Sequence, residues 1–332
     1  MSQFKQDGKL IVMAFPDTFV RMSGEWLCRF LPLVGLGTRE YIKAGHAALV
    51  LIENASGQAR YFDFGRYITP DGHGRVRSAQ TDVELEIPIK AQIDQNGALQ
   101  NTDEFLLWLE ANPQKTHGEG RLLASVCDRI DFKRAEDFIL GLQNRGSIPY
   151  GAFVKDGSNC SRFVTETLLA ATSDQKIIKR LNWNKKFTPS TVGNVEKAAT
   201  ESAVFQVLNG NLEQFSGTAF KENLKNYFHK KRNGSTVESK NGSPSESAQY
   251  LSGIGSSAWF DLLPSEHLPQ ADFVIHRYNE DQVLDFKGVF RADQPLDPHV
   301  EYEFIYDSHC AKCTVVQKGK RIELTLKKSL FN

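Results

Sequence analysis

The sequence predicts an α+β fold followed by a small all-β domain in a chain of 332 residues. In the first half, strand-like and helix-like apolar runs are mixed, and successive strands are joined by short turns. Hairpins of this kind favour an antiparallel sheet over a repeated βαβ unit. A polar stretch then separates this half from a region of short alternating runs, which is typical of a separate β domain.

The composition divides the chain into four segments. Residues 1–172 carry the mixed strands and helices, and residues 173–228 are expected to be a mainly helical extension. Residues 229–248 are polar and rich in Ser, Gly and Lys, which is typical of a flexible linker. Residues 249–332 form the predicted β domain.

Strands are expected first in the N-terminal segment. Residues 9–15 are apolar and predict a strand, whereas residues 16–43 are expected to be helical or irregular. Residues 45–52 and 59–64 are two strand-like runs around a polar turn, so they predict a β-hairpin. The strict alternation over residues 83–89 predicts a half-buried strand.

Helices follow at residues 101–111 and 132–143, with a strand between them at 121–127. A further helix is expected to begin near Cys160. The β domain is expected to contain five strands, at residues 273–278, 283–290, 300–306, 313–317 and 322–327.

Charge and cysteine content restrict the class of protein. Forty basic side chains balance forty acidic ones, so no overall field attracts nucleic acid or an anionic membrane. No apolar stretch is long enough to span a bilayer, and the N-terminus lacks the pattern of a signal peptide. Five widely spaced cysteines argue against a disulfide framework. We therefore expect a cytoplasmic protein with no nucleic-acid partner.

Cys160 is the strongest candidate for a reactive group. It follows the polar turn at 156–159, whose residues are good helix caps, and lies four residues before Val164 on the apolar stripe of a helix. The positive end of a helix favours a thiolate and can stabilise an oxyanion. The alternative is a buried structural thiol, because free cysteine packs well as a small apolar residue.

A thiol nucleophile needs a base and a group that orients the base. His46 opens the first hairpin strand, on the face that also carries Ala48 and Val50, which are small enough to leave room on this face for a neighbouring helix such as that of Cys160. Asp63 lies on the second hairpin strand, where aspartate is unfavourable, so it is a candidate orienting carboxylate. The alternative for Asp63 is a solvent-facing position on a one-sided sheet.

Residues 45–51, 61–64 and 159–164, together with Tyr150, resemble the circularly permuted NlpC/P60 (papain-like) superfamily. Within it, the pattern is similar to the YiiX-like and lecithin:retinol acyltransferase-like groups. The resemblance covers about residues 9–172 and depends on the order of the motifs: histidine strand, polar residue on the next strand, late cysteine helix. It implies a permuted papain-like domain with an antiparallel sheet.

The resemblance implies that Cys160 is the nucleophile, His46 the general base and then acid, and Asp63 the orienting residue. It also implies a cysteine-dependent hydrolase or acyltransferase that attacks an amide, ester or thioester carbonyl. Peptides, lipids and isopeptides all remain open as substrates. Tyr150 is a candidate to line the cleft, and the alternative for it is ordinary packing in the turn after Pro149. The sequence departs from acyltransferase-like members at Asp63, where they often carry a second histidine, and at Arg162, where they often carry an acidic residue. The competing hypothesis is a non-catalytic binding protein on the same fold.

His309, Cys310 and Cys313 supply half of a structural zinc site. No second Cys-x-x-Cys pair completes it, so two thiols in a β turn are favoured over a zinc-dependent assembly module. Glycine-rich phosphate loops are also missing, and we expect no cofactor. The tail from about residue 253 resembles an uncharacterised small bacterial β module, and this resemblance supports a domain boundary only. A role of the β domain in targeting or partner recognition is a separate hypothesis.

Overall fold

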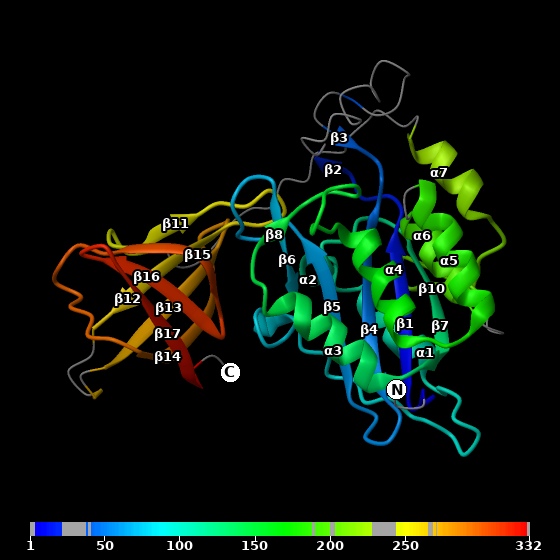
Figure 1. Cartoon of the computed structure of the whole chain (residues 1–332), viewed down its shortest axis with the longest axis horizontal. Helices are drawn as coiled ribbons and strands as arrows, with labels where there is room; N and C mark the ends of the chain where they lie inside the picture. The colour runs from blue at the N-terminus through cyan, green and yellow to red at the C-terminus, as the bar shows by residue number, and fades with distance from the viewer. Residues whose placement is uncertain are drawn as a thin grey trace.

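The computed structural model describes residues 4–21, 38, 41–187, 190–199, 203–227, 244–264, 268–269 and 271–330. These residues form two large antiparallel sheets that lie beside each other, with the helices around the first (Figure 1). The arrangement is consistent with the predicted α+β class. Most of the predicted linker at 229–248 lies outside the described residues.

The first sheet has eight strands in the order β10-β9-β7-β1-β4-β5-β6-β8. Its strands are β1 (Gly8–Phe15), β4 (His46–Glu53), β5 (Ala59–Gly65), β6 (His73–Arg77), β7 (Leu122–Ile130), β8 (Ile148–Pro149), β9 (Phe205–Leu208) and β10 (Asn211–Gln214). A separate ribbon pairs β2 (Val20–Arg21) with β3 (Tyr41–Ile42). The predicted hairpin of β4 and β5 is confirmed.

Seven α-helices are described: α1 (Thr102–Glu110), α2 (Pro113–Thr116), α3 (Phe132–Gln143), α4 (Cys160–Ala171), α5 (Gln175–Phe187), α6 (Thr191–Ala198) and α7 (Ala219–Tyr227). Helices α3, α4 and α6 pack on one face of the first sheet, and α1 packs on the other. Both faces of the central strands are therefore buried, which explains the unbroken apolar runs in β1 and β4.

One assignment of strand faces was wrong. Ala48 and Val50 face the core that contains α1, whereas Ala47 and Leu49 belong to the core that contains α4. The helix of Cys160 therefore packs against the opposite face from the one predicted. Cys160 reaches His46 because both residues lie at the start of their elements, at the same end of the sheet.

The predicted strand at 83–89 is also wrong. Val83–Leu85 form a single 3-10 turn, and the residues after it are extended without pairing in a sheet. The alternation has another cause: Leu85 and Ile87 enter the apolar core, while Glu84 forms an ion pair with Arg277.

The region after residue 172 was predicted to be mainly helical, but it also contains a hairpin. Strands β9 and β10 turn at Asn209 and Gly210, which both have positive φ angles. Asn-Gly is a strong hairpin signal that the helical expectation overlooked. Strand β9 pairs with β7 and so extends the first sheet.

The second sheet has seven strands in the order β11-β12-β13-β14-β17-β16-β15. They are β11 (Gln249–Leu251), β12 (Ala258–Leu263), β13 (Asp272–Asn279), β14 (Leu284–Ala292), β15 (Glu303–His309), β16 (Lys312–Gln317) and β17 (Lys320–Ser329). The five predicted strands are present, and β11 and β12 are additional. The Gln249 side chain bonds the Tyr302 carbonyl at 2.8 Å and the Phe304 amide at 2.6 Å, so the two edge strands approach each other.

A buried ionic network joins the two sheets. Arg277 of β13 donates to Asp82 at 3.2 Å and to Glu84 at 3.0 Å. Arg75 of β6 holds the same Asp82 carboxylate with two bonds of 2.7 and 2.8 Å. Charges buried to this extent require partners, so the network fixes the second sheet against the first.

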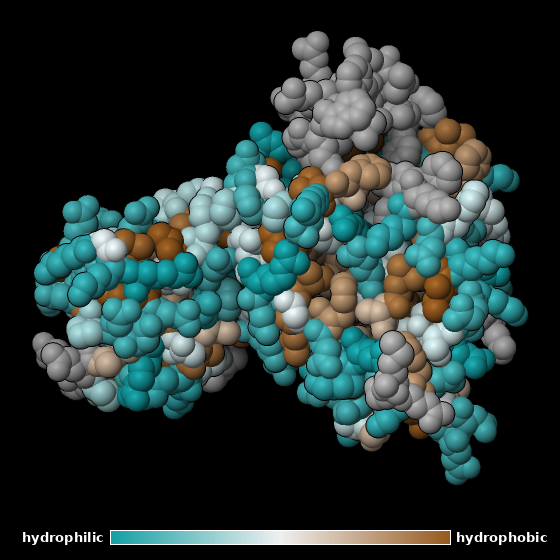
Figure 2. Space-filling model, in the orientation of Figure 1, coloured by the Kyte–Doolittle hydropathy of each residue, from teal (hydrophilic) through white to brown (hydrophobic). Residues whose placement is uncertain are grey.

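The molecular surface is mixed in character. In the view of Figure 2, apolar side chains form patches that polar side chains separate, over both sheets. Within the described ranges, no helix has the length and apolar character that crossing a bilayer would require.

Candidate active site

Cys160 is the first residue of α4, and only 8% of it is exposed. Asn159 caps the helix by accepting a 2.8 Å hydrogen bond from the Arg162 amide. Burial alone would raise the pKa of the Cys160 thiol. The hydrogen bond and charge of His46, with backbone N–H groups of Ala47 and Ser161, outweigh burial and lower this pKa below its ordinary value. The site therefore favours a thiolate, the reactive form of cysteine.

His46 begins β4 and is 6% exposed. Its Nε2 lies 3.3 Å from Oδ2 of Asp63, and its ring also interacts with Cys160. Burial lowers the pKa of His46, but the hydrogen bonds with Asp63 and Cys160 more than offset this effect and raise the pKa to about 9. The two shifts therefore favour an imidazolium beside a thiolate more than an isolated histidine and cysteine would.

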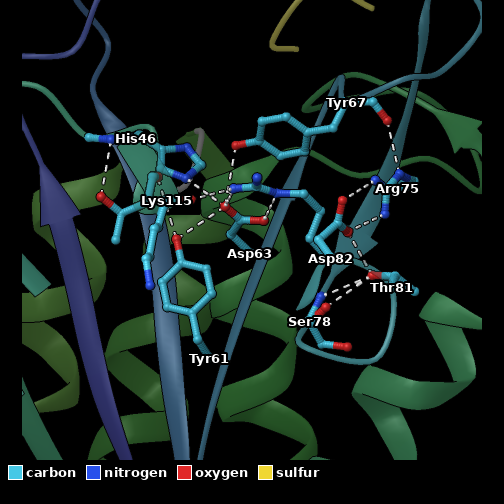
Figure 3. Close-up of polar contacts among 12 residues, drawn as sticks. His46, Tyr61, Asp63, Tyr67, Arg75, Ser78, Thr81, Asp82 and Lys115 are labelled. Atoms are coloured by element: carbon cyan, nitrogen blue, oxygen red, sulfur yellow. Dashed lines mark hydrogen bonds and ion pairs between the residues drawn. The ribbon is translucent and has the colours of Figure 1, made fainter. Parts of the chain in front are cut away.

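Asp63 is fully buried on β5, opposite Ala48 of β4. Its carboxylate accepts hydrogen bonds from Arg77 at 3.0 and 2.6 Å, from Tyr61 at 3.1 Å and from Tyr67 at 3.3 Å (Figure 3). Burial would raise the pKa of this carboxyl, but the Arg77 charge and the bonds from His46 and Arg77 hold it well below its usual range. Asp63 is therefore ionised, and the solvent-facing alternative is excluded.

The structure thus brings Cys160, His46 and Asp63 together, and it adds two groups that were not predicted. Arg77 stands directly opposite Asp63 in the pairing of β5 with β6. A buried aspartate in a strand needs a counter-charge, and cross-strand neighbours are the first place to seek it. Tyr67 follows β5 and places its hydroxyl on the same carboxylate oxygen as Tyr61.

Cys160 and His46 open onto a cavity of about 1000 Å³. Tyr150 lines it, as predicted, and stacks on Phe64 with ring centroids 6.0 Å apart. His117 also lines it, and burial followed by the charge of Arg77 lowers its pKa to about 3, so its ring is neutral. The far wall comes from the second sheet, through residues 253–258 and 279–281.

The Cys-x-x-Cys segment does not line this cavity. Cys310 is in the β15–β16 turn, Cys313 is in β16, and both thiols are buried, which raises their pKa values. Burial likewise lowers the pKa of His309 to about 3. Across the described parts of the chain, no group of three or more His, Cys, Asp or Glu side chains is placed to hold a metal ion. Cys28 lies outside the described residues.

Comparisons with known proteins give two family matches. Residues 10–177 match the family described as type VI secretion system effector TseH-like, and residues 248–327 match the DUF6695 C-terminal domain. A crystal structure of the type VI secretion system effector TseH aligns with a TM-score of 0.42 at 20% identity, covering 63% of this chain and 97% of that one. No curated protein matches the sequence.

The first match spans the strands of His46 and Asp63 and the helix of Cys160, and it covers half of the chain. The protein belongs to the TseH-like family of type VI secretion system effectors.

Proposed function

We propose that the protein is a cysteine-dependent hydrolase or acyltransferase that acts on an amide, ester or thioester carbonyl. One observation carries the proposal: Cys160, His46 and the ionised Asp63 lie together in a buried cluster, in which Nε2 of His46 is 3.3 Å from Oδ2 of Asp63 and the His46 ring interacts with Cys160. This is the arrangement that activates a thiol nucleophile and holds its base in one orientation. The permuted papain-like relationship inferred from the motifs is part of the same proposal.

In the proposed reaction, the Cys160 thiolate attacks the carbonyl carbon and forms a C–S bond. Backbone N–H groups at the start of α4 stabilise the resulting oxyanion. The His46 imidazolium gives its proton to the leaving amine or alcohol, and a thioacyl enzyme remains. Neutral His46 then removes a proton from water or from an acceptor amine, which attacks the thioester and releases the thiolate.

Asp63 keeps its charge throughout this cycle because Arg77 and two tyrosine hydroxyls bind it. Its proposed role is to fix the ring of His46 and to stabilise the imidazolium. Arg77 offsets the cost of burying this carboxylate, and so it acts on catalysis only through Asp63.

We propose that the enzyme acts after export, because it belongs to a family of secretion system effectors. The cytoplasmic expectation then applies to the producing cell. We also propose that residues 249–332 form a domain of their own, which the match to a separate C-terminal family supports.

Trapping the thioacyl intermediate tests the reaction type. Full-length protein is mixed with an activated ester such as p-nitrophenyl acetate, and the intact mass is followed against time. We expect an acetyl adduct on Cys160 in the wild type, none on that residue in Cys160→Ala, and much slower formation in His46→Ala. If Cys160 of the wild type gains no acetyl group, the protein is better described as a non-catalytic binding protein on this fold.

A further inference from the structure

Tyr67 connects the proposed catalytic groups to the second sheet. Its hydroxyl donates to Asp63 at 3.3 Å, and its ring is 3% exposed. The guanidinium carbon of Arg77 lies 3.7 Å from the ring centroid, and the ring of His117 lies 5.0 Å from it. In Figure 3 the hydroxyls of Tyr61 and Tyr67 both point at the Asp63 carboxylate.

The backbone on both sides of Tyr67 is bound by the segment that connects β11 to β12. The Gly255 amide donates to the carbonyl of Arg66 at 2.8 Å, and the Ile68 amide donates to the carbonyl of Ser256 at 2.9 Å. Tyr67 and Ser256 form a parallel bridge between these two bonds. Arg75 of β6 also donates to the Tyr67 carbonyl at 2.9 Å, so the position of Tyr67 depends on contacts from both sheets.

Gly255 packs directly on the ring of Tyr67. A Cβ atom at position 255 would lie 2.9 Å from Cε1 of the ring, closer than real Cβ contacts allow. The Tyr67 ring cannot move freely away from such a Cβ atom, because Arg77 covers the ring and the Tyr67 hydroxyl is bound to Asp63. Only glycine at position 255 is therefore compatible with the observed position of the Tyr67 ring.

Tyr61 makes the same kind of hydrogen bond without the second sheet. Its hydroxyl donates to Asp63 at 3.1 Å and to the carbonyl of Thr116 at 3.4 Å. Its ring belongs to the core that contains α1. The two tyrosines therefore form a pair for comparison: Tyr61 is held by the first sheet alone, whereas Tyr67 contacts Arg75 and Arg77 of the first sheet and also the segment from the second sheet.

We propose that the segment 253–257 of the second sheet is part of the active site, because it seats Tyr67 and through it aligns Asp63 and His46. Tyr67 is a positioning residue in this proposal, which rests on the function proposed above. The second sheet then completes the catalytic site as well as forming the far wall of the cavity. Chemistry at Cys160 requires the two sheets to be docked.

The experiment measures the rate at which iodoacetamide alkylates Cys160 in the full chain, from about pH 5 to about pH 9, with the modified peptide quantified by mass spectrometry. The variants are Gly255→Ala, Tyr67→Phe, Tyr61→Phe and the two doubles that combine Gly255→Ala with each tyrosine change. Gly141→Ala is the control, because a Cβ atom at that position of α3 meets nothing within 4 Å.

We expect Gly255→Ala to slow alkylation at neutral pH roughly tenfold, the scale of one lost hydrogen bond to a charged group. The acid limb of the pH profile should move to higher pH, because a misaligned Asp63 stabilises the imidazolium less. The change should add nothing in the Tyr67→Phe background and should have its full effect in the Tyr61→Phe background. Gly141→Ala should match the wild type.

Two outcomes overturn the inference: a Gly255→Ala profile equal to that of the wild type, or an effect that is fully additive with Tyr67→Phe. A wild-type Cys160 that reacts no faster than the denatured thiol contradicts the proposed function instead. If Gly255→Ala does not fold, Arg277→Lys is used instead. This change weakens the contact between the two sheets, because lysine lacks the guanidinium group that binds both Asp82 and Glu84. The same dependence on Tyr67 is then expected.

Discussion

Arg77 and Asp63 stand directly opposite each other on β6 and β5 and share two hydrogen bonds of 3.0 and 2.6 Å. Both side chains are buried, and the positive charge of Arg77 balances the negative charge of Asp63 in the protein interior. An ionised Asp63 then raises the pKa of His46, and the positive ring lowers that of Cys160. The reactivity proposed for the Cys160 thiol thus depends on Arg77, which lies two strands away from His46 and keeps Asp63 ionised.

Replacing Arg77 with methionine should affect both stability and the site. Asp63 would remain buried without its counter-charge, which we expect to cost about 3–5 kcal/mol in the free energy of unfolding. The pKa of Asp63 should rise, and that of His46 should fall. Urea unfolding and NMR titration of His46 measure these changes. Arg77→Lys keeps the charge but loses the two-pronged contact, so an intermediate result is expected. Equal behaviour of both variants would show that the charge without the two-pronged contact contributes nothing, and would contradict the role given to charge.

Asp63→Asn should separate two effects of Asp63: the orientation of the His46 ring and the negative charge beside it. An asparagine can still accept a hydrogen bond from His46 but does not stabilise the imidazolium. Burial then counts for more and only Cys160 still opposes it, so the pKa of His46 should fall from about 9. The fraction of Cys160 present as thiolate at neutral pH should fall as the pKa of His46 falls. The ultraviolet absorbance of the thiolate measures this fraction. Asp71→Asn, in an exposed loop, serves as the control. An unchanged thiolate population in Asp63→Asn would remove Asp63 from the account.

The same pKa shifts predict how stability depends on pH. The raised pKa of His46 contributes stability that is complete below 6.5 and disappears as the pH rises through about 9. The lowered pKa of Asp63 contributes stability above 3.8 that is lost as the pH falls. The difference in unfolding free energy between wild type and His46→Gln should therefore shrink as the pH rises from about 6.5 to about 9. A difference that grows over this range would reverse the assigned sign.

The contact between the sheets should depend on Arg277. Arg277→Gln removes a buried charge from Asp82 and Glu84, and we expect a loss of about 3 kcal/mol or more in the free energy of unfolding. Arg291→Ala is the matched control, because its side chain is 51% exposed and its ion pair with Asp272 should contribute less than about 1 kcal/mol. Thermal unfolding of the full chain compares them. Similar losses in both variants would mean that the buried network is not what holds the sheets together.

Local patterns in the sequence predicted much of the site. The hairpin that carries His46 and Asp63 follows from two alternating runs around a turn, and the start of α4 follows from the capping residues before Cys160. Each of these signals lies within a few residues of the feature it predicts. The order of the motifs then suggested that the three side chains meet.

Contacts between distant segments were not predictable in this way. Asp82 and Arg277 are 195 residues apart in the sequence, and no periodicity links them. The face on which α4 packs was misassigned because both faces of β4 are buried and apolar, so the alternation in that strand does not distinguish them. The contact of Gly255 with the Tyr67 ring likewise depends on how the two sheets pack together. The spacing of residues within a short segment does not predict such packing.

The most direct test of the central claim is the alkylation rate of Cys160 in the native wild-type protein at about pH 6.5, relative to the same peptide in denatured protein. The account predicts that the native thiol reacts at least about tenfold faster, because His46 holds it as a thiolate at a pH where a free thiol is almost fully protonated. His46→Ala should remove this advantage. A native Cys160 that reacts no faster than the denatured thiol from about pH 6 to about pH 8 would contradict the account.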